Sequence, residues 1–324
     1  MKAAFVIEDN FIKVAYQEHN GKTIVHKQSK NKSEYESTFI LEDNFCYTTK
    51  TLENVKLANP KLNIFTNILS EPRQTFITSK GDQWNNRQLT AILFKKILHD
   101  INTNSIEAIT SAVVALAPDV NEEFQEDLDA CIKANGVLST SYSTYGTACQ
   151  KYTKSTREKQ LQQVVINLSM EKTFVLGEKK ITVDGFGYLD QLLITQLEEQ
   201  NAIRIDQFSE TEKFLISEEL KKININVLNK IGQNEYIILL NDRYLNFRVP
   251  FLEIENSIEE RLNNVKESLS DCIFDVLIIT GRMMVFPLIG ETCRNLFTDK
   301  EFENVILDTQ NEIKSRGLLV NQNS

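Results

Sequence analysis

The stretch VVINLSMEKTFV, residues 164–175, decides how the rest of the chain is interpreted. Its first three residues are apolar and β-branched, which predicts a buried strand, and ITVDGFG at 181–187 predicts its hairpin partner. In one large class of folds that bind phosphate, such a strand leads into an acidic residue and a run of glycines, whose N–H groups approach the anion closely. Here the strand leads into Asn, Leu, Ser, Met, Glu and Lys at 167–172, so the glycines are missing.

Glycine is scarce in the whole chain, with 11 residues in 324. An average chain contains roughly 7% glycine, about twice as much. Because glycine lets backbone amides approach a phosphate, the chain has few positions at which a phosphate-binding loop could form.

The overall composition is that of an ordinary globular protein, with 41% hydrophobic and 25% charged residues. The length suits one large or two medium domains. The chain contains no apolar run of about 18 residues, so no membrane-spanning helix is predicted. The N-terminal sequence MKAAFVIEDNF is interrupted by Glu8 and Asp9, so it is not a secretory signal.

Charge and cysteine content indicate a cytoplasmic protein that does not bind nucleic acid directly. The net charge of −9 argues against a broad basic face. The five cysteines are odd in number, widely spaced and without a CxxC pair, which favours reduced thiols over a disulfide framework or a zinc site. Three histidines without paired spacing likewise predict no metal site.

Hydrophobic periodicity predicts two α/β halves, each with hairpin strands followed by strand–helix units. In the first half, Asp119 is expected to cap a helix, with Glu122 completing a capping box. The other expected elements are strands at 3–7, 13–17, 23–25, 112–117 and 276–279, helices at 86–100, 188–199, 250–269, 287–297 and 312–319, and a hairpin over 236–249 that turns at Asn241 and Asp242.

Four further stretches carry a resemblance to a known family. They are residues 51–69 around an Asn-Pro pair, 108–152 with a strand, a turn and two helices, 274–293 with a strand, a glycine turn and a helix that starts at proline, and 311–322 with a closing helix. In their order and local sequence they resemble the nucleotide-binding domain of the DnaK-type 70-kDa heat-shock chaperones. The resemblance implies an α/β, two-lobed actin-like ATPase fold built from ribonuclease H-like repeats.

The resemblance also implies a domain division. Residues 1–160 correspond to lobe I, residues 161–305 to lobe II, and residues 306–324 to a closing helix that returns toward lobe I. The family's peptide-binding half would follow this helix, so no substrate-binding domain is expected in this chain.

In the first half, the residues at the family's phosphate-binding positions differ from those of the family in charge and polarity. Its first phosphate loop, an Asp, a Gly and two Thr, corresponds to Val6, Glu8, Asp9 and Asn10, so two acidic side chains stand where amide and hydroxyl groups would hold an anion. Like charge at short range costs on the order of 1 kcal/mol even in a wet site. The family's catalytic lysine corresponds to a position near Glu53, which removes a cation that steadies the transferred phosphoryl group.

The positions in the second half are changed as well. The acidic residue, three glycines and threonine of the second phosphate loop correspond to Asn167, Ser169, Met170, Glu171 and Lys172. A turn that carries these side chains is not expected to close on a phosphate. The resemblance therefore implies a pseudo-ATPase that is not an enzyme and has no cofactor.

Two glycine turns are only partly kept. Gly185 is followed by Phe186 where the family has a second glycine, and Gly281 is followed by Arg282. Bulky Met283, Met284 and Phe286 come next, and they either fill a vacant adenine pocket or belong to an ordinary core. A Mg²⁺ site formed by Glu8, Asp9, Asp184 and Asp190 is an alternative to plain solvated carboxylates.

Within the family, the chain looks most like the Ssz-type subunit of the ribosome-associated complex. That implies a non-catalytic chaperone-like subunit that binds a J-protein partner, and through it the ribosome, and assists the folding of nascent chains. No membrane partner is expected. The alternatives are a family member that binds or hydrolyses ATP, and an actin-like scaffold or exchange-factor protein of another complex, including a bacterial one.

Overall fold

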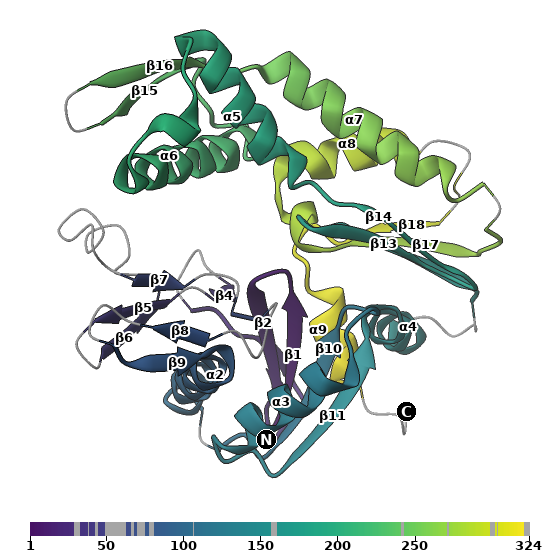
Figure 1. The fold of residues 1–324 in the computed structure, drawn as a ribbon. Coiled ribbons are helices and arrows are strands. Elements are labelled where there is room, and N and C mark those ends of the chain that lie inside the picture. Colours follow the sequence, from purple (N-terminus) through teal and green to yellow (C-terminus); the bar gives the residue numbers. More distant parts are fainter. Residues whose placement is uncertain are drawn as a thin grey trace. The chain divides into compact units, whose positions relative to one another are not determined.

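The structure is a computed structural model (Figure 1). It describes residues 1–28, 33–37, 39–42, 45–48, 63–65, 68–69, 75–77, 81–105, 107–156, 161–240, 243–270, 272–298, 302 and 304–320. The chain forms two compact α/β units with mixed sheets. The first unit combines Met1–Gln160 with Glu312–Ser324, and the second is Leu161–Asn311.

The sheet of the first unit joins a three-stranded meander to two parallel strands. Its strands are β1 (Lys2–Glu8), β2 (Phe11–Gln17), β3 (Thr23–Val25), β10 (Ser111–Leu116) and β11 (Ser139–Thr144), in the order β11-β10-β1-β2-β3, with β4 (Glu34–Glu36) also pairing with β2. β1, β2 and β3 are antiparallel neighbours, whereas β10 runs parallel to β1 and β11 runs parallel to β10.

Helices pack on this sheet because apolar residues recur along one face of each. α2 (Asn86–Asn102) starts with a capping box between Asn85 and Gln88 and buries Leu89, Leu93 and Phe94. The ring of Phe94 meets that of Phe5 on β1 edge-on, with centroids 5.2 Å apart. The other helices of this unit are α3 (Glu122–Lys133), α4 (Tyr145–Thr156) and α9 (Ile313–Leu318).

Five short strands form two small sheets in the first unit. They are β5 (Phe39–Glu42), β6 (Phe45–Thr48) and β7 (Asn63–Phe65) in one sheet, and β8 (Thr75–Ile77) and β9 (Gln83–Asn85) in the other.

The sheet of the second unit repeats the strand order of the first. Its strands are β12 (Gln163–Asn167), β13 (Lys172–Leu176), β14 (Lys180–Asp184), β17 (Val276–Thr280) and β18 (Val305–Leu307), in the order β14-β13-β12-β17-β18. The first three are antiparallel, β17 is parallel to β12, and β18 is parallel to β17. β12 is buried along its whole length, which confirms the strand predicted from its β-branched residues.

The helices of the second unit share one hydrophobic core with its sheet. They are α5 (Tyr188–Asn201), α6 (Glu210–Leu228), α7 (Phe251–Glu267) and α8 (Pro287–Phe297), together with the 3₁₀ turns η2 (Ile205–Gln207) and η3 (Arg282–Val285). A separate hairpin of β15 (Glu235–Leu239) and β16 (Tyr244–Arg248) packs against α5. The alternation predicted for this hairpin is confirmed, whereas its predicted turn lies outside the described residues.

One sequence prediction about a helix was wrong, and one helix was not predicted. Asp119 does not cap α3: Asn121 does, and its Oδ1 accepts a hydrogen bond of 2.8 Å from the N–H of Phe124. The backbone around Asp119 is instead held in a turn by the N–H of Val120, which donates to Ala117. The 19-residue helix α6 was not predicted at all.

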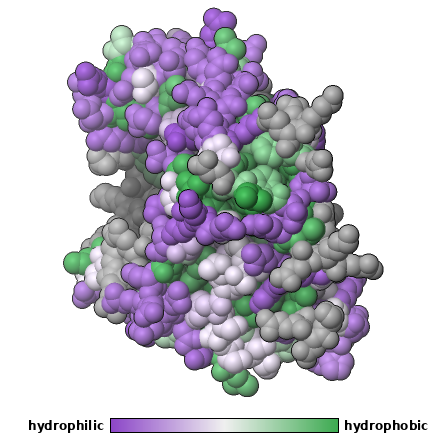
Figure 2. All heavy atoms as spheres, turned by 90° about the vertical axis from the view of Figure 1, so that its right-hand side faces the viewer, coloured by the Kyte–Doolittle hydropathy of each residue, from purple (hydrophilic) through white to green (hydrophobic). Residues whose placement is uncertain are grey.

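Figure 2 shows one face of the molecule, on which hydrophilic residues prevail and hydrophobic residues gather in a limited area. Among the residues that the structure describes, no helix combines the length and the apolar character needed to cross a bilayer.

Candidate functional site

In the second unit, the turn at the predicted phosphate position is closed by the backbone itself. Three consecutive N–H groups at the start of α5 donate to three consecutive carbonyls of residues 169–171. The bonds are Gly185 to Glu171 at 2.9 Å, Phe186 to Ser169 at 3.1 Å and Gly187 to Met170 at 2.7 Å. Because each N–H group already donates to a protein carbonyl, the three cannot also cradle an anion without breaking these bonds.

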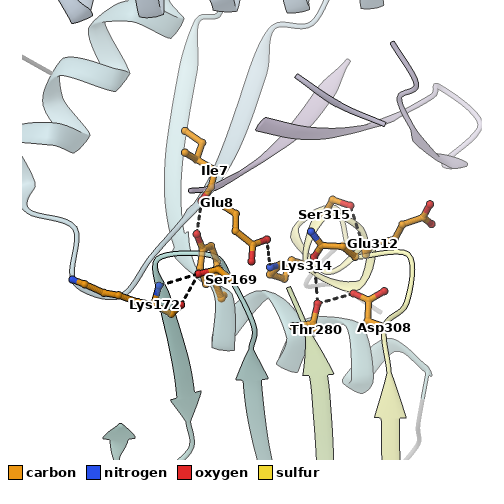
Figure 3. Close-up of polar contacts among 11 residues, drawn as sticks. Ile7, Glu8, Ser169, Lys172, Thr280, Asp308, Glu312, Lys314 and Ser315 are labelled. Carbon is orange, nitrogen blue, oxygen red and sulfur yellow. Dashed lines mark hydrogen bonds and ion pairs between the residues drawn. The ribbon is translucent and has the colours of Figure 1, made fainter. Parts of the chain in front are cut away.

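Hydrogen bonds of the Ser169 side chain also stabilise this turn (Figure 3). The Oγ of Ser169 donates to the carbonyl of Lys172 at 2.5 Å and accepts from the Lys172 N–H at 3.3 Å. Ser169 is buried, and so is Asn167 at the end of β12. The turn is therefore a packed connection between β12 and β13.

Gly185 and Gly281 permit close approach of backbone to backbone. A Cβ added at Gly185 would lie 2.5 Å from the carbonyl oxygens of Ser169 and Met170, and one at Gly281 would lie 2.2 Å from that of Leu168. Gly281 also has a φ of 112°, which disfavours any side chain. These glycines are required by packing, whatever else they do.

The residues after Gly281 belong to the core of the second unit. Met283 and Met284 in η3 are buried within the hydrophobic cluster, and Phe286 packs against it. The N–H of Met283 donates to the carbonyl of Leu168 at 3.1 Å, which ties this turn to the end of β12. Of the two interpretations offered by the sequence, this packing favours the ordinary core.

A buried polar cluster that the sequence did not reveal lies at the end of β17. The Oγ1 of Thr280 donates to Oδ2 of Asp308 at 2.7 Å and lies 3.4 Å from Oδ1 of Asn311. All three residues are buried, and the N–H of Asp308 donates to the carbonyl of Ile279. The cluster fixes the chain as it leaves the second unit.

In the first unit, Asp9 and Asn10 form the tight turn between β1 and β2. Glu8 pairs with Phe11 in the ladder, and Asp9 adopts a φ of 49°. The carbonyl of Asn10 accepts a 2.7 Å hydrogen bond from the N–H of Ser37. Asp9 and Asn10 therefore form the turn of the hairpin that positions Glu8.

Glu8 is buried, and its charge is balanced by a lysine from the far end of the chain. The Nζ of Lys314 on α9 lies 2.8 Å from Oε2 of Glu8, and the two side chains are only 0% and 4% exposed (Figure 3). The sequence pointed to like charge from Glu8 and Asp9 at this position, and the structure adds a basic partner for Glu8. Nothing in the local sequence indicates this partner, because Lys314 lies 306 positions after Glu8.

Tyr145 completes this buried cluster. Its hydroxyl donates to the carbonyl of Ile7, and the Nζ of Lys314 lies 4.6 Å from the centroid of its ring, a cation–π contact. Burial raises the pKa of Tyr145 well above its usual range, and the negative charges of Glu8, Asp9 and Asp119 act in the same direction. Tyr145 is thus a neutral hydrogen-bond donor, and Lys314 supplies the positive charge that balances Glu8.

Of the remaining predicted acidic residues, the two that the structure describes, Asp184 and Asp190, have different partners. Glu53 lies outside the described residues. Asp184 is 92% exposed and faces Arg261 at 3.7 Å, whereas Asp190 accepts a 2.7 Å bond from Nδ2 of Asn224. Among the described residues, no group of three His, Cys, Asp or Glu side chains is arranged to hold a metal ion.

A surface hollow of about 1130 Å³ in the second unit is a further candidate. Phe274 and Phe302 in its wall stack with centroids 5.9 Å apart, and the Nζ of Lys266 lies 5.6 Å from the ring of Phe302. Both rings also pack against the hydrophobic cluster of this unit. Packing at the rim of the core therefore accounts for these residues.

Comparison with models of known protein families and with curated proteins finds no match to this sequence.

Proposed function

We propose that the chain is a two-lobed, actin-like body of the type found in the nucleotide-binding domain of DnaK-type chaperones. The repeated strand order supports this proposal. Both sheets have three antiparallel strands followed by two parallel ones, in the same order and directions. Such a repeat within one chain is what two ribonuclease H-like halves require.

The body is proposed to be non-catalytic. The observation that carries this is the closed turn at 169–171, whose carbonyls accept the N–H groups of 185–187. Phosphoryl transfer depends on N–H groups and cations that are directed at the phosphate in advance. In this chain the N–H group of Lys172 within the turn donates to the Oγ of Ser169, and the N–H groups of 185–187 donate to the carbonyls of the turn.

The proposed activity of the chain is to bind a partner protein. By its sequence resemblance to Ssz-type subunits, the chain binds a J-protein in the cytoplasm and assists nascent-chain folding at the ribosome. The net charge of −9 fits an arrangement in which the partner supplies the contacts to ribosomal RNA.

Isothermal titration of the full chain with Mg-ATP tests the non-catalytic part. No saturable heat and no release of phosphate are expected. Micromolar binding, with or without turnover, would contradict it and would favour the alternative of an ATP-binding member of the family.

Affinity purification of the tagged chain, with each recovered protein identified, tests the partner. A J-protein that co-elutes with the chain in gel filtration after both are purified separately is expected. If the identified partner is another chaperone or complex, the scaffold or exchange-factor alternative replaces the J-protein proposal.

A further inference from the structure

The hairpin of β15 and β16 has one buried face and one exposed apolar face. Ile238 and Phe247 are buried against the core of the second unit. On the opposite face, Ile237, Leu239 and Tyr244 are 64%, 72% and 62% exposed. Two of these three apolar residues lie on β15, so the exposed apolar surface is concentrated on that strand.

The outer edge of β16 is covered by side-chain amides from the end of α5. Gln200 and Asn201 each form two hydrogen bonds with one strand residue. Asn201 donates to the Asn246 carbonyl at 2.7 Å and accepts from its N–H at 3.2 Å, while Gln200 donates to the Arg248 carbonyl at 2.8 Å and accepts from its N–H at 2.7 Å. The two amides imitate a third strand, and they prevent another chain from pairing there.

The outer edge of β15 has a different environment. The N–H of Val249 donates to Asn234 at 2.9 Å and that of Leu240 donates to Arg243 at 2.8 Å, so even-numbered residues of β15 face β16. The backbone groups of the odd-numbered residues in 235–239 therefore point away from β16. In the part of the chain that the structure describes, no other strand joins this two-stranded sheet.

We propose that β15 is a docking edge to which an extended segment of a partner protein adds as a third strand. The open N–H and C=O groups of Ile237 and Leu239 supply the main-chain hydrogen bonds. Their exposed side chains favour a segment with apolar residues at alternate positions. Glu235 at the start of the strand lies opposite Arg248 across the hairpin, and its carboxylate can also face a lysine or arginine of the added segment.

A second copy of this chain fits the edge less well than such a segment. β15 has five residues, whereas a stable interface involves about 20–30 residues on each side. Antiparallel pairing of two copies about Ile237 would also place Glu235 opposite Leu239, so that a charge faces an apolar side chain. An extended segment can instead match each position and continue beyond the strand. This surface does not depend on whether the chain binds nucleotide.

Selection of short linear peptides displayed against the full chain tests the proposal. The enriched peptides are expected to alternate apolar and polar residues and to carry a basic residue. Their affinity, measured by fluorescence anisotropy, should fall by about tenfold or more in Ile237→Lys. Methylation of alternate backbone nitrogens in the peptide should abolish binding, because it removes the main-chain donors.

Leu252→Lys is the matched control, since Leu252 on α7 is 67% exposed in the same unit. It should leave peptide affinity unchanged. The proposal is overturned if no peptide is enriched, if the enriched peptides bind Ile237→Lys as tightly as the wild type, or if N-methylation has no effect.

Hydrogen exchange and sedimentation give a second test on the unmodified chain. The N–H groups of Ile237 and Leu239 should exchange rapidly, and those of Asn246 and Arg248 slowly, until peptide protects the first pair. Self-association that is lost in Ile237→Lys would show instead that a second copy covers β15, which contradicts the proposal.

Discussion

The Nζ of Lys314 lies 2.8 Å from Oε2 of Glu8, and both side chains are buried. The pair joins α9 to the end of β1 within the first unit. A buried ion pair is weak support for stability as a whole, but removal of one partner leaves an uncompensated charge in the core.

Lys314→Met should therefore destabilise the chain by about 3–5 kcal/mol. The double variant Glu8→Gln with Lys314→Met should lose less than the single one, because no isolated carboxylate remains. Urea unfolding of the wild type, both single variants and the double variant measures the coupling. Additive losses would show that the two groups do not interact.

Gly281→Ala should cost about 3 kcal/mol or more, because the new Cβ meets the Leu168 carbonyl and φ is 112°. Gly136→Ala is the matched control: its φ is 90°, but a Cβ there meets nothing within 4 Å. That variant should cost only the strain of a left-handed residue, about 1–2 kcal/mol. Thermal unfolding of both variants compares them, and equal losses would rule out the clash as the cause.

His26 gives the stability of the first unit a pH dependence. Its Nε2 lies 2.9 Å from the Tyr35 hydroxyl, which donates to Asp100 at 3.0 Å, and Lys96 lies 3.3 Å from the same carboxylate. The ring of Tyr16 packs beside the imidazole. Burial lowers the pKa of His26, although the charge of Asp100 opposes the shift.

Because the folded pKa is below the unfolded value of about 6.5, the unfolded chain binds the proton more readily. The stabilising contribution is complete above about pH 6.5 and is lost as the pH falls through the folded pKa. Urea midpoints between mildly alkaline and mildly acidic pH should fall more steeply for the wild type than for His26→Gln. Parallel profiles would remove His26 as the cause.

Restoring three glycines at Ser169, Met170 and Glu171 should destabilise the second unit without creating an ATPase. The loss of the Ser169 side-chain bonds and the gain in unfolded-state entropy together should cost about 1–3 kcal/mol. Phosphate release and urea unfolding are measured on the same preparation. Turnover of ATP by the triple variant would overturn the packing explanation of this turn.

The elements that local pattern determines could be predicted from the sequence. The alternation of residues 236–249 gave the correct faces of the β15–β16 hairpin, and the proline at 287 marked the start of α8. α6 was missed, although Ser209 and Glu212 form a capping box that the sequence displays as S-x-x-E. Its buried residues Ile216, Leu220, Ile223 and Val227 also recur at spacings of three and four, so periodicity was a second signal that went unused.

The buried polar contacts could not be predicted, because they join distant parts of the chain. Nothing local in the sequence assigns Lys314 to Glu8, or Asp308 to Thr280. Likewise, the sequence shows a serine at position 169, but not that its hydroxyl donates to the Lys172 carbonyl across the turn. Pairing of this kind depends on the completed fold rather than on neighbouring residues.

Because α9 completes the first unit, that unit cannot finish folding until Ile313–Leu318 have left the ribosome. Glu8 leaves the ribosome early, but its cationic partner is translated 306 residues later. The second unit, whose residues are continuous in sequence, can reach its native state first, so the order of maturation is the reverse of the order of translation.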